Sequence, residues 1–152
     1  MSVNILGELR SNHVLWSSIC SWAVAQFIKI LIELVRTKKI NAALIMSSGG
    51  MPSSHSSFVT AMTTSIGLKE GFNSSIFALC AVFSMVVMYD AAGVRRAAGY
   101  QAAAINMLAE RLEGQGIKLD KKLKELLGHS PIQVAAGAAL GVLVAVAITY
   151  FV

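Results

Sequence analysis

The sequence predicts an all-α, polytopic membrane helix bundle with about four spans and a short amphipathic interfacial helix. Hydrophobic residues make up 55% of the 152 residues and charged residues only 14%, which is far from the composition of a soluble globular domain. The apolar residues are gathered in runs that are long enough to cross a bilayer. The length suits one integral membrane domain over residues 1–152.

The net charge of +5 fits a membrane surface better than a nucleic acid. The chain has neither an aromatic RNA-binding platform nor a basic arm, so we expect no nucleic-acid partner. Cys20 and Cys80 lie inside apolar runs without metal-ligand spacing. They are expected to be buried small hydrophobic residues.

The first predicted span, residues 14–35, carries charges in its second half. Such charges are costly in lipid and should face protein, water or headgroups. Lys29, Glu33 and Arg36 are spaced i, i+4, i+7, so they share one helix face, with the two cations about 10.5 Å apart along the axis. A solvated ion pair at the helix end is the alternative interpretation.

The middle of the chain predicts one short and one long helix. Residues 53–68 form a helix rich in Ser and Thr, whose length of roughly 24 Å suits the inside of a bundle better than lipid. Residues 72–89 are the clearest hydrophobic run and predict a full span that stops at Asp90. Residues 91–113 are expected to continue this helix out of the membrane.

The last part of the chain predicts an interfacial helix and a final span. Residues 118–127 place leucines among charged side chains, as in a helix lying at a membrane interface. Residues 132–152 are long enough to cross, and Gly137 and Gly141 form a G-x-x-x-G pair that permits close helix packing.

Four antiparallel segments would gather the basic stretches 36–39 and 95–124 on one membrane side, opposite both termini. The positive-inside rule makes this side cytoplasmic, and we expect the protein in the plasma membrane with its active site facing the cytoplasm. The residues that would converge on this side are Lys29, Arg36, His55, Asp90, Arg95, Arg96 and His129.

Two punctuated helix starts carry histidines within this group. Glycines and Pro52 precede a helix that Ser53 or Ser54 can cap, and His55 follows directly. Such a helix N-terminus favours an anion such as phosphate, although a capped helix after a loop is the plain structural alternative. His129 stands at the second start, before Ser130-Pro131.

Residues of these types suit phosphoryl transfer without a metal. Lysine and arginine neutralise phosphate oxygens, a neutral histidine can attack phosphorus, and a protonated one can protonate the leaving oxygen. The sequence contains no Walker loop, Asp-x-Asp pair or His/Cys cluster. We therefore expect no metal and no cofactor.

The motifs resemble those of the type-two phosphatidic acid phosphatase superfamily, which also includes vanadium haloperoxidases, and in particular its divergent membrane branch. The superfamily's first motif, Lys-x6-Arg-Pro, is similar to Lys29 and Arg36, with Thr37 replacing the proline. Its second, Pro-Ser-Gly-His, resembles residues 52–55, with Ser54 in place of glycine. The resemblance extends over about residues 29–137.

The third motif, His-x-Pro-x-Asp-Val-x-x-Gly, resembles residues 129–137, with Gln133 in place of the aspartate. The resemblance implies that His129 is the nucleophile and His55 the general acid. It implies phosphate binding by Lys29, Arg36, Ser53 and Ser54.

Two departures from the superfamily concern charge at the site. Leu123 occupies the place of the third motif's arginine, so Arg95 or Arg96, in a run typical of the divergent branch, is the candidate replacement. Gln133 can orient the histidine but cannot stabilise its positive charge as a carboxylate does. Either Asp90 or Glu125 supplies the carboxylate or activity is weak or altered, and residues 130–133 also read as a capping box.

The resemblance implies a membrane enzyme that hydrolyses a lipid phosphate monoester or diphosphate through a phosphohistidine. A noncatalytic phospholipid-binding or scaffold protein is one alternative, which Gln133 favours. A small channel or transporter subunit is another, which the G-x-x-x-G pair favours. Since the superfamily's membrane enzymes usually have six helices, a homodimer could supply missing walls.

Overall fold

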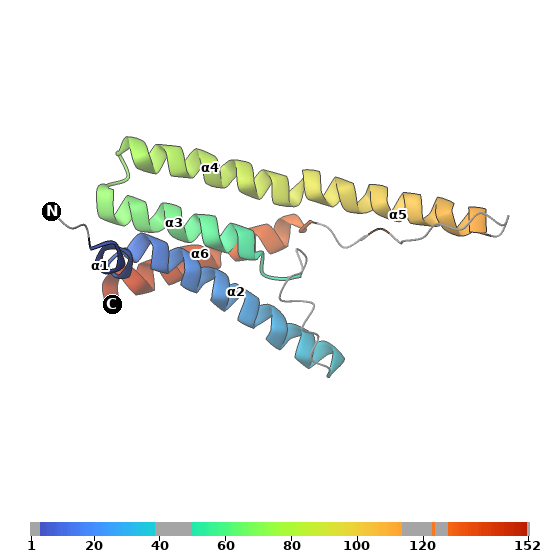
Figure 1. Ribbon diagram of the computed structural model, residues 1–152, viewed down its shortest axis with the longest axis horizontal. Helices are drawn as coiled ribbons and strands as arrows, with labels where there is room; N and C mark the ends of the chain where they lie inside the picture. The colour runs from blue at the N-terminus through green and yellow to red at the C-terminus, as the bar shows by residue number, and fades with distance from the viewer. Residues whose placement is uncertain (1–3, 39–49, 114–122, 124–127, 152) are drawn as a thin grey trace.

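The computed structural model describes residues 4–38, 50–113, 123 and 128–151, and these residues contain helices and no strand. The helices are α1 (Ile5–Arg10), α2 (His13–Thr37), α3 (Ser54–Glu70), α4 (Ser75–Ala92), α5 (Val94–Glu113) and α6 (Pro131–Phe151). In Figure 1, α2, α3, α4 and α6 form a bundle in which successive helices run in opposite directions. The predicted all-α membrane bundle is confirmed, and α1 is an additional short helix.

Three of the described helical segments are long and apolar enough to cross a membrane: α2, the continuous Ser75–Glu113 segment and α6. Helix α3 has 17 residues and is not among them. It lies at the centre of the bundle, where it packs against α2, α4 and α6. This is the place expected for a short helix rich in Ser and Thr, because neighbouring helices shield it from lipid.

Hydroxyl groups on α3 bond to all three neighbouring helices. Such interhelical hydrogen bonds in a membrane each contribute about 1 kcal/mol. Because they point in three directions, they fix α3 against rotation. The contacts are Ser57 with Ser21 of α2, Thr60 with the carbonyl of Ala138 of α6 at 3.1 Å, and Thr63 with Ser84 of α4 at 2.7 Å.

The two glycines of α6 pack directly against α3. A Cβ atom on Gly137 would overlap the carbonyl oxygen of Ser53, and one on Gly141 would lie 2.9 Å from the nitrogen of Ala61. Real Cβ atoms do not come so close to backbone atoms. The predicted role of the G-x-x-x-G pair in close packing is therefore confirmed, and the contact is with α3.

Helix α5 continues in the direction of α4 beyond the end of the bundle (Figure 1). Its Asn106 amide donates to the carbonyl of Leu123 at 2.8 Å and accepts from the Leu123 nitrogen at 2.9 Å. These two bonds hold Leu123 against α5. Apart from Leu123, the predicted interfacial helix 118–127 lies outside the described residues.

The antiparallel arrangement places four segment ends together. Both termini lie at one end of the bundle, whereas the end of α2, the start of α3, the α4–α5 junction and the start of α6 lie toward the other end (Figure 1). The residues that carry the sequence motifs come from this second set. The fold therefore builds a site from four separate stretches of the chain.

Candidate functional site

Two histidines face each other where α3 and α6 begin. The ring centroids of His55 and His129 are 6.1 Å apart and the rings are tilted edge to face. His129 is only 1% exposed. Nδ1 of His55 and Nε2 of His129 are buried and have no hydrogen-bond partner among the described residues. The sequence prediction that these two histidines lie together is met, and each has a nitrogen left free for a ligand.

The hydrogen bonds around Gln133 determine which nitrogen of His129 carries the proton. Oε1 of Gln133 lies 3.0 Å from the backbone N–H of Ser130, which can only donate, so this atom is the amide oxygen. The same oxygen lies 3.3 Å from Nδ1 of His129. Because an amide oxygen only accepts, Nδ1 must hold the proton. Nε2 then presents its lone pair.

Gln133 makes both contacts that the sequence suggested: it belongs to a capping box and it is bonded to His129. The backbone N–H of Gln133 lies 3.4 Å from the Ser130 hydroxyl, which completes the reciprocal capping box at the start of α6. The same side chain orients His129. One residue thus both caps the helix and fixes the tautomer.

Backbone contacts that sequence reasoning missed hold His129 in place. Its N–H donates to the carbonyl of Ala91 at the end of α4, at 2.9 Å. Gly128, directly before it, has a φ of +85°, and a Cβ there would overlap the backbone of Arg96. Only glycine combines this conformation with so close an approach. The sequence signal that could have indicated this close approach is the glycine directly before His129.

Burial lowers the pKa of His129 below its ordinary value of 6.5, and the positive charge of Lys29 lowers it further. The hydrogen bond with Gln133 and a contact with the backbone of Gly50 act in the opposite direction, and the nearby His55 adds to the lowering. Both desolvation and a neighbouring cation disfavour the imidazolium form. His129 is therefore neutral at neutral pH, as a nucleophile must be.

Ser53 caps α3 and ties it to α6. Its hydroxyl accepts from the N–H of Ser56 at 3.3 Å and from the Ser56 hydroxyl at 2.9 Å. Its backbone N–H donates to the carbonyl of Gln133 at 3.0 Å. The hydroxyl of Ser53, predicted to bind phosphate, is thus engaged in the cap. These bonds join the second and third sequence motifs.

Lys29 lies in the interior of the bundle, 3% exposed, although it is on a predicted membrane span. Its ammonium donates to the hydroxyl of Ser54 at 3.2 Å. Its aliphatic chain passes 3.8 Å from the place that a Cβ of Gly50 would occupy. A buried cation without a carboxylate bonded to it in the described structure is costly in a membrane, which makes Lys29 a candidate functional residue.

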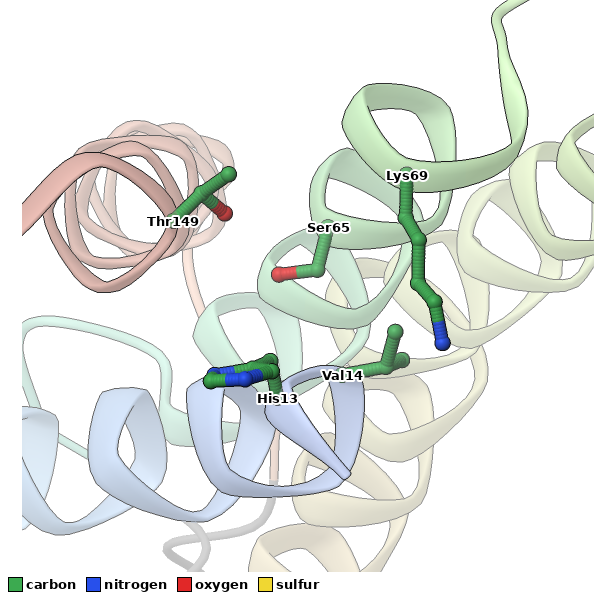
Figure 2. A pocket seen from close by; sticks show the side chains of 5 residues that line it. All are labelled: His13, Val14, Ser65, Lys69 and Thr149. Carbon is green, nitrogen blue, oxygen red and sulfur yellow. The ribbon is translucent and has the colours of Figure 1, made fainter. Parts of the chain in front are cut away.

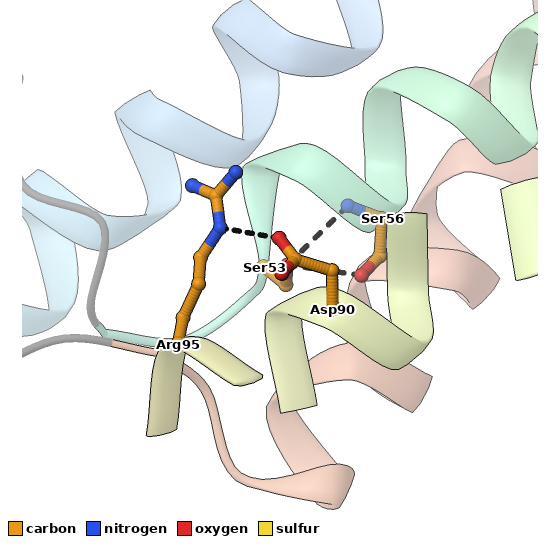
Figure 3. A network of polar contacts seen from close by, with 4 residues as sticks. All are labelled: Ser53, Ser56, Asp90 and Arg95. Atoms are coloured by element: carbon orange, nitrogen blue, oxygen red, sulfur yellow. Dashed lines mark hydrogen bonds and ion pairs between the residues drawn. The ribbon is translucent and has the colours of Figure 1, made fainter. Parts of the chain in front are cut away.

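Asp90 and Arg95 form an ion pair beside the histidines, with Nε of Arg95 2.6 Å from the carboxylate (Figure 3). Both side chains are partly exposed. Burial lowers the pKa of His55 below its ordinary value of 6.5, the charges of Arg95 and Lys29 lower it further, and the charge of Asp90 acts in the opposite direction. Asp90 is therefore bonded to an arginine, and the group bonded to His129 is Gln133.

The other two arginines that the sequence analysis assigned to the site, Arg96 and Arg36, have different surroundings. Arg96 donates to the Tyr100 hydroxyl at 3.0 Å, and its guanidinium lies 5.6 Å from the centroid of that ring. Arg36 is exposed near the end of α2. Neither is brought into contact with the histidines, and Glu125 lies outside the described residues. Of the two adjacent arginines, Arg95 is the one beside the site.

A sequence model of the Divergent PAP2 family matches residues 10–144. The chain belongs to the Divergent PAP2 family. Another membrane protein, the uncharacterized YuiD of Bacillus subtilis strain 168, is 43% identical over 155 residues, which cover 95% of this chain and 98% of that protein. No solved structure matches the chain. The match to the Divergent PAP2 family includes all the site residues described above, from Lys29 to Gln133.

Proposed function

We propose that this protein is an integral membrane phosphatase that removes a phosphate monoester or diphosphate from a lipid through a phosphohistidine intermediate. The observation that carries the proposal is the pair His55 and His129, 6.1 Å apart, each with a buried nitrogen that has no hydrogen-bond partner among the described residues. Membership of the Divergent PAP2 family supports a phosphatase-related membrane protein. The lysine and arginine beside the pair supply charge for a phosphate.

In the first step, Nε2 of His129 attacks phosphorus, and the bond from phosphorus to the leaving oxygen breaks. Protonated His55 gives its proton to this oxygen, so that the lipid alcohol or lipid monophosphate leaves with its leaving oxygen protonated. The proton on Nδ1 of His129 stays on the hydrogen bond to Gln133. Lys29 and Arg95 stabilise the charge on the phosphate oxygens during transfer.

In the second step, water attacks phosphorus of the phosphohistidine, and His55 accepts the proton of that water. The bond from phosphorus to Nε2 breaks, which releases inorganic phosphate and restores neutral His129. The two histidines thus return to their starting protonation states. Arg95 is bonded to Asp90, so it can bind phosphate only if it breaks this ion pair or holds both anions at once. While no phosphate is bound, Asp90 serves as the counterion of Arg95.

A lipid substrate suits the position of the pair at one end of a bundle of membrane helices. The end of α2, with Arg36 and Lys38, and the first turn of α5, with Arg95 and Arg96, lie toward that end. The positive-inside rule supports a cytoplasmic site. We propose the plasma membrane as its location.

The test is phosphate release by the purified protein from phosphatidic acid and from a polyprenyl diphosphate. His129→Ala and His55→Ala should each lower the rate by at least about 100-fold, since general acid–base and nucleophilic groups contribute that much or more. His13→Ala is the matched control, because this exposed histidine lies at the start of α2, far from the pair. Activity should persist in a chelator. Equal rates in all three variants would refute the site.

A second candidate function is phospholipid binding without turnover. The observation that favours it is the amide of Gln133, which orients His129 but adds no negative charge for the imidazolium that develops. This function predicts saturable binding of phosphatidic acid that Lys29→Met weakens, with no phosphate released. The same purified protein distinguishes the two.

A further inference from the structure

A cavity lies at the end of the bundle opposite the histidine pair. It has a volume of about 380 Å³ and is lined by His13, Val14, Ser65, Lys69 and Thr149 (Figure 2). These residues come from the start of α2, the end of α3 and the end of α6. Along α2, His13 is about 24 Å from Lys29, so the cavity and the histidine pair are separated by most of a bilayer's roughly 30 Å core.

Ser65 is the feature that points to a ligand. It is 3% exposed, and its hydroxyl is buried with no hydrogen-bond partner among the described residues. In Figure 2 this hydroxyl points toward the space between His13 and Thr149. Serine and threonine in membrane helices usually donate to the carbonyl four residues earlier, as Thr63 does at 2.9 Å and Thr149 at 2.8 Å.

The remaining lining groups supply positive charge and hydrogen bonds. Lys69 lies 3.9 Å from Glu70, but both side chains are more than half exposed, so this ion pair is weak and leaves the ammonium able to bind another anion. His13 adds an imidazole. The imidazole and the free hydroxyl match the oxygens of a phosphate group, and the long side chain of Lys69, whose ammonium lies beyond Val14 in Figure 2, adds positive charge nearby.

An adjoining hollow favours a phosphate that is carried by a lipid. It shares Val14 and Lys69 with the first cavity and is also lined by the apolar side chains of Leu15, Phe58 and Met62. A headgroup at Ser65 and Lys69 would place its chains beside this apolar surface. Free phosphate would leave the hollow unused.

We propose that the cavity binds the phosphate of an anionic phospholipid headgroup in the leaflet opposite the histidine pair. The site is independent of the proposed hydrolysis, because it lies at the other end of the bundle and shares no residue with the histidine site. Its volume is within the range of small-molecule sites and accommodates a phosphoglycerol group.

The experiment uses the full chain carrying His55→Ala and His129→Ala, so that the other site does not contribute. Phosphatidylglycerol retained from nanodiscs of phosphatidylcholine and phosphatidylglycerol is counted by native mass spectrometry, and inorganic phosphate is titrated calorimetrically. Ser65→Ala and Lys69→Gln should each weaken phosphatidylglycerol binding about tenfold, as expected for a lost hydrogen bond to a charged group.

Two control variants leave the proposed contacts intact. Ser75→Ala removes an exposed hydroxyl at the same end of the bundle, and Glu70→Gln removes the neighbouring negative charge. Both should bind phosphatidylglycerol at least as well as the parent. Ser65→Ala should also keep the parent's melting temperature, because the lost hydroxyl has no partner in the described structure.

The two ligands distinguish the possible sources of the phosphate. Weakened phosphatidylglycerol binding without measurable binding of inorganic phosphate supports a lipid site, and weakening of both shows that the phosphate group alone is recognised there. Phosphatidylglycerol retention that neither Ser65→Ala nor Lys69→Gln changes would overturn the proposal, because the cavity would then hold water only. Absence of hydrolysis in the unaltered chain would leave this result unaffected.

Discussion

Replacing Gln133 with glutamate tests how the environment of His129 sets its chemistry. The two side chains have nearly the same shape, so a glutamate at this position would keep the bond from the Ser130 N–H and with it the cap of α6. The change puts a full negative charge where an amide oxygen now lies 3.3 Å from Nδ1 of His129. Gln133→Glu therefore restores the kind of group that the superfamily places there.

The distance gives the size of the effect. Unit charges 3.3 Å apart attract by about 5 kcal/mol at an effective dielectric constant of about 20. Desolvation of the new carboxylate offsets part of this energy, and neighbouring opposite charges usually shift a pKa by about 1–3 units, or roughly 1.4–4 kcal/mol. The pKa of His129 should rise by such an amount, and hydrolysis should accelerate about tenfold or more above that pKa.

The assay is NMR titration of the histidine rings in the purified protein, together with phosphate release as a function of pH. Gln101→Glu, on the exposed surface of α5, makes the same charge change away from the site and should alter neither quantity. An unchanged His129 pKa in Gln133→Glu would refute the assigned contact. A raised pKa without faster hydrolysis would instead refute the nucleophilic role.

Arg95→Ala should slow hydrolysis about tenfold or more in parallel rate assays, whereas Arg96→Ala should change it less than about twofold, because Arg96 is directed away from the site. Gly141→Ala should lower stability by about 1–3 kcal/mol in a denaturation experiment, since the added methyl group overlaps α3. Because the pKa of His129 is lowered, the loss of hydrolysis caused by protonation of His129 should occur below pH 6.5, as the pH drops through that lowered value. Lys29→Met should move this acid limb to higher pH, since the lysine charge contributes to the lowering.

The helices could be predicted from sequence because their signals are local. Apolar runs, the cap at Ser53 and the break at Gly71 all act within a few residues. The structure places α3 at Ser54–Glu70 and α4 at Ser75–Ala92, within a few residues of the predicted ranges. The convergence of the motifs also followed, since successive segments that cross a membrane alternate in direction.

The contacts inside the site could not be predicted, because they depend on distances between separate helices. Spacing alone grouped Arg95 with Arg96, and only the fold separates the ion pair with Asp90 from the contact with Tyr100. Spacing likewise grouped Arg36 with Lys29, although one is exposed and the other buried. The cavity at Ser65 left no motif in the sequence, because its residues come from three distant helix ends.

Capture of the phosphohistidine tests the proposed hydrolysis most directly. The protein is mixed with ³²P-labelled phosphatidic acid, quenched in base, in which phosphohistidine survives, and digested for mass spectrometry. Label is expected on Nε2 of His129, lost in His129→Ala and retained in the His13→Ala control. Turnover of the substrate with no label on His129 during the steady state would contradict it.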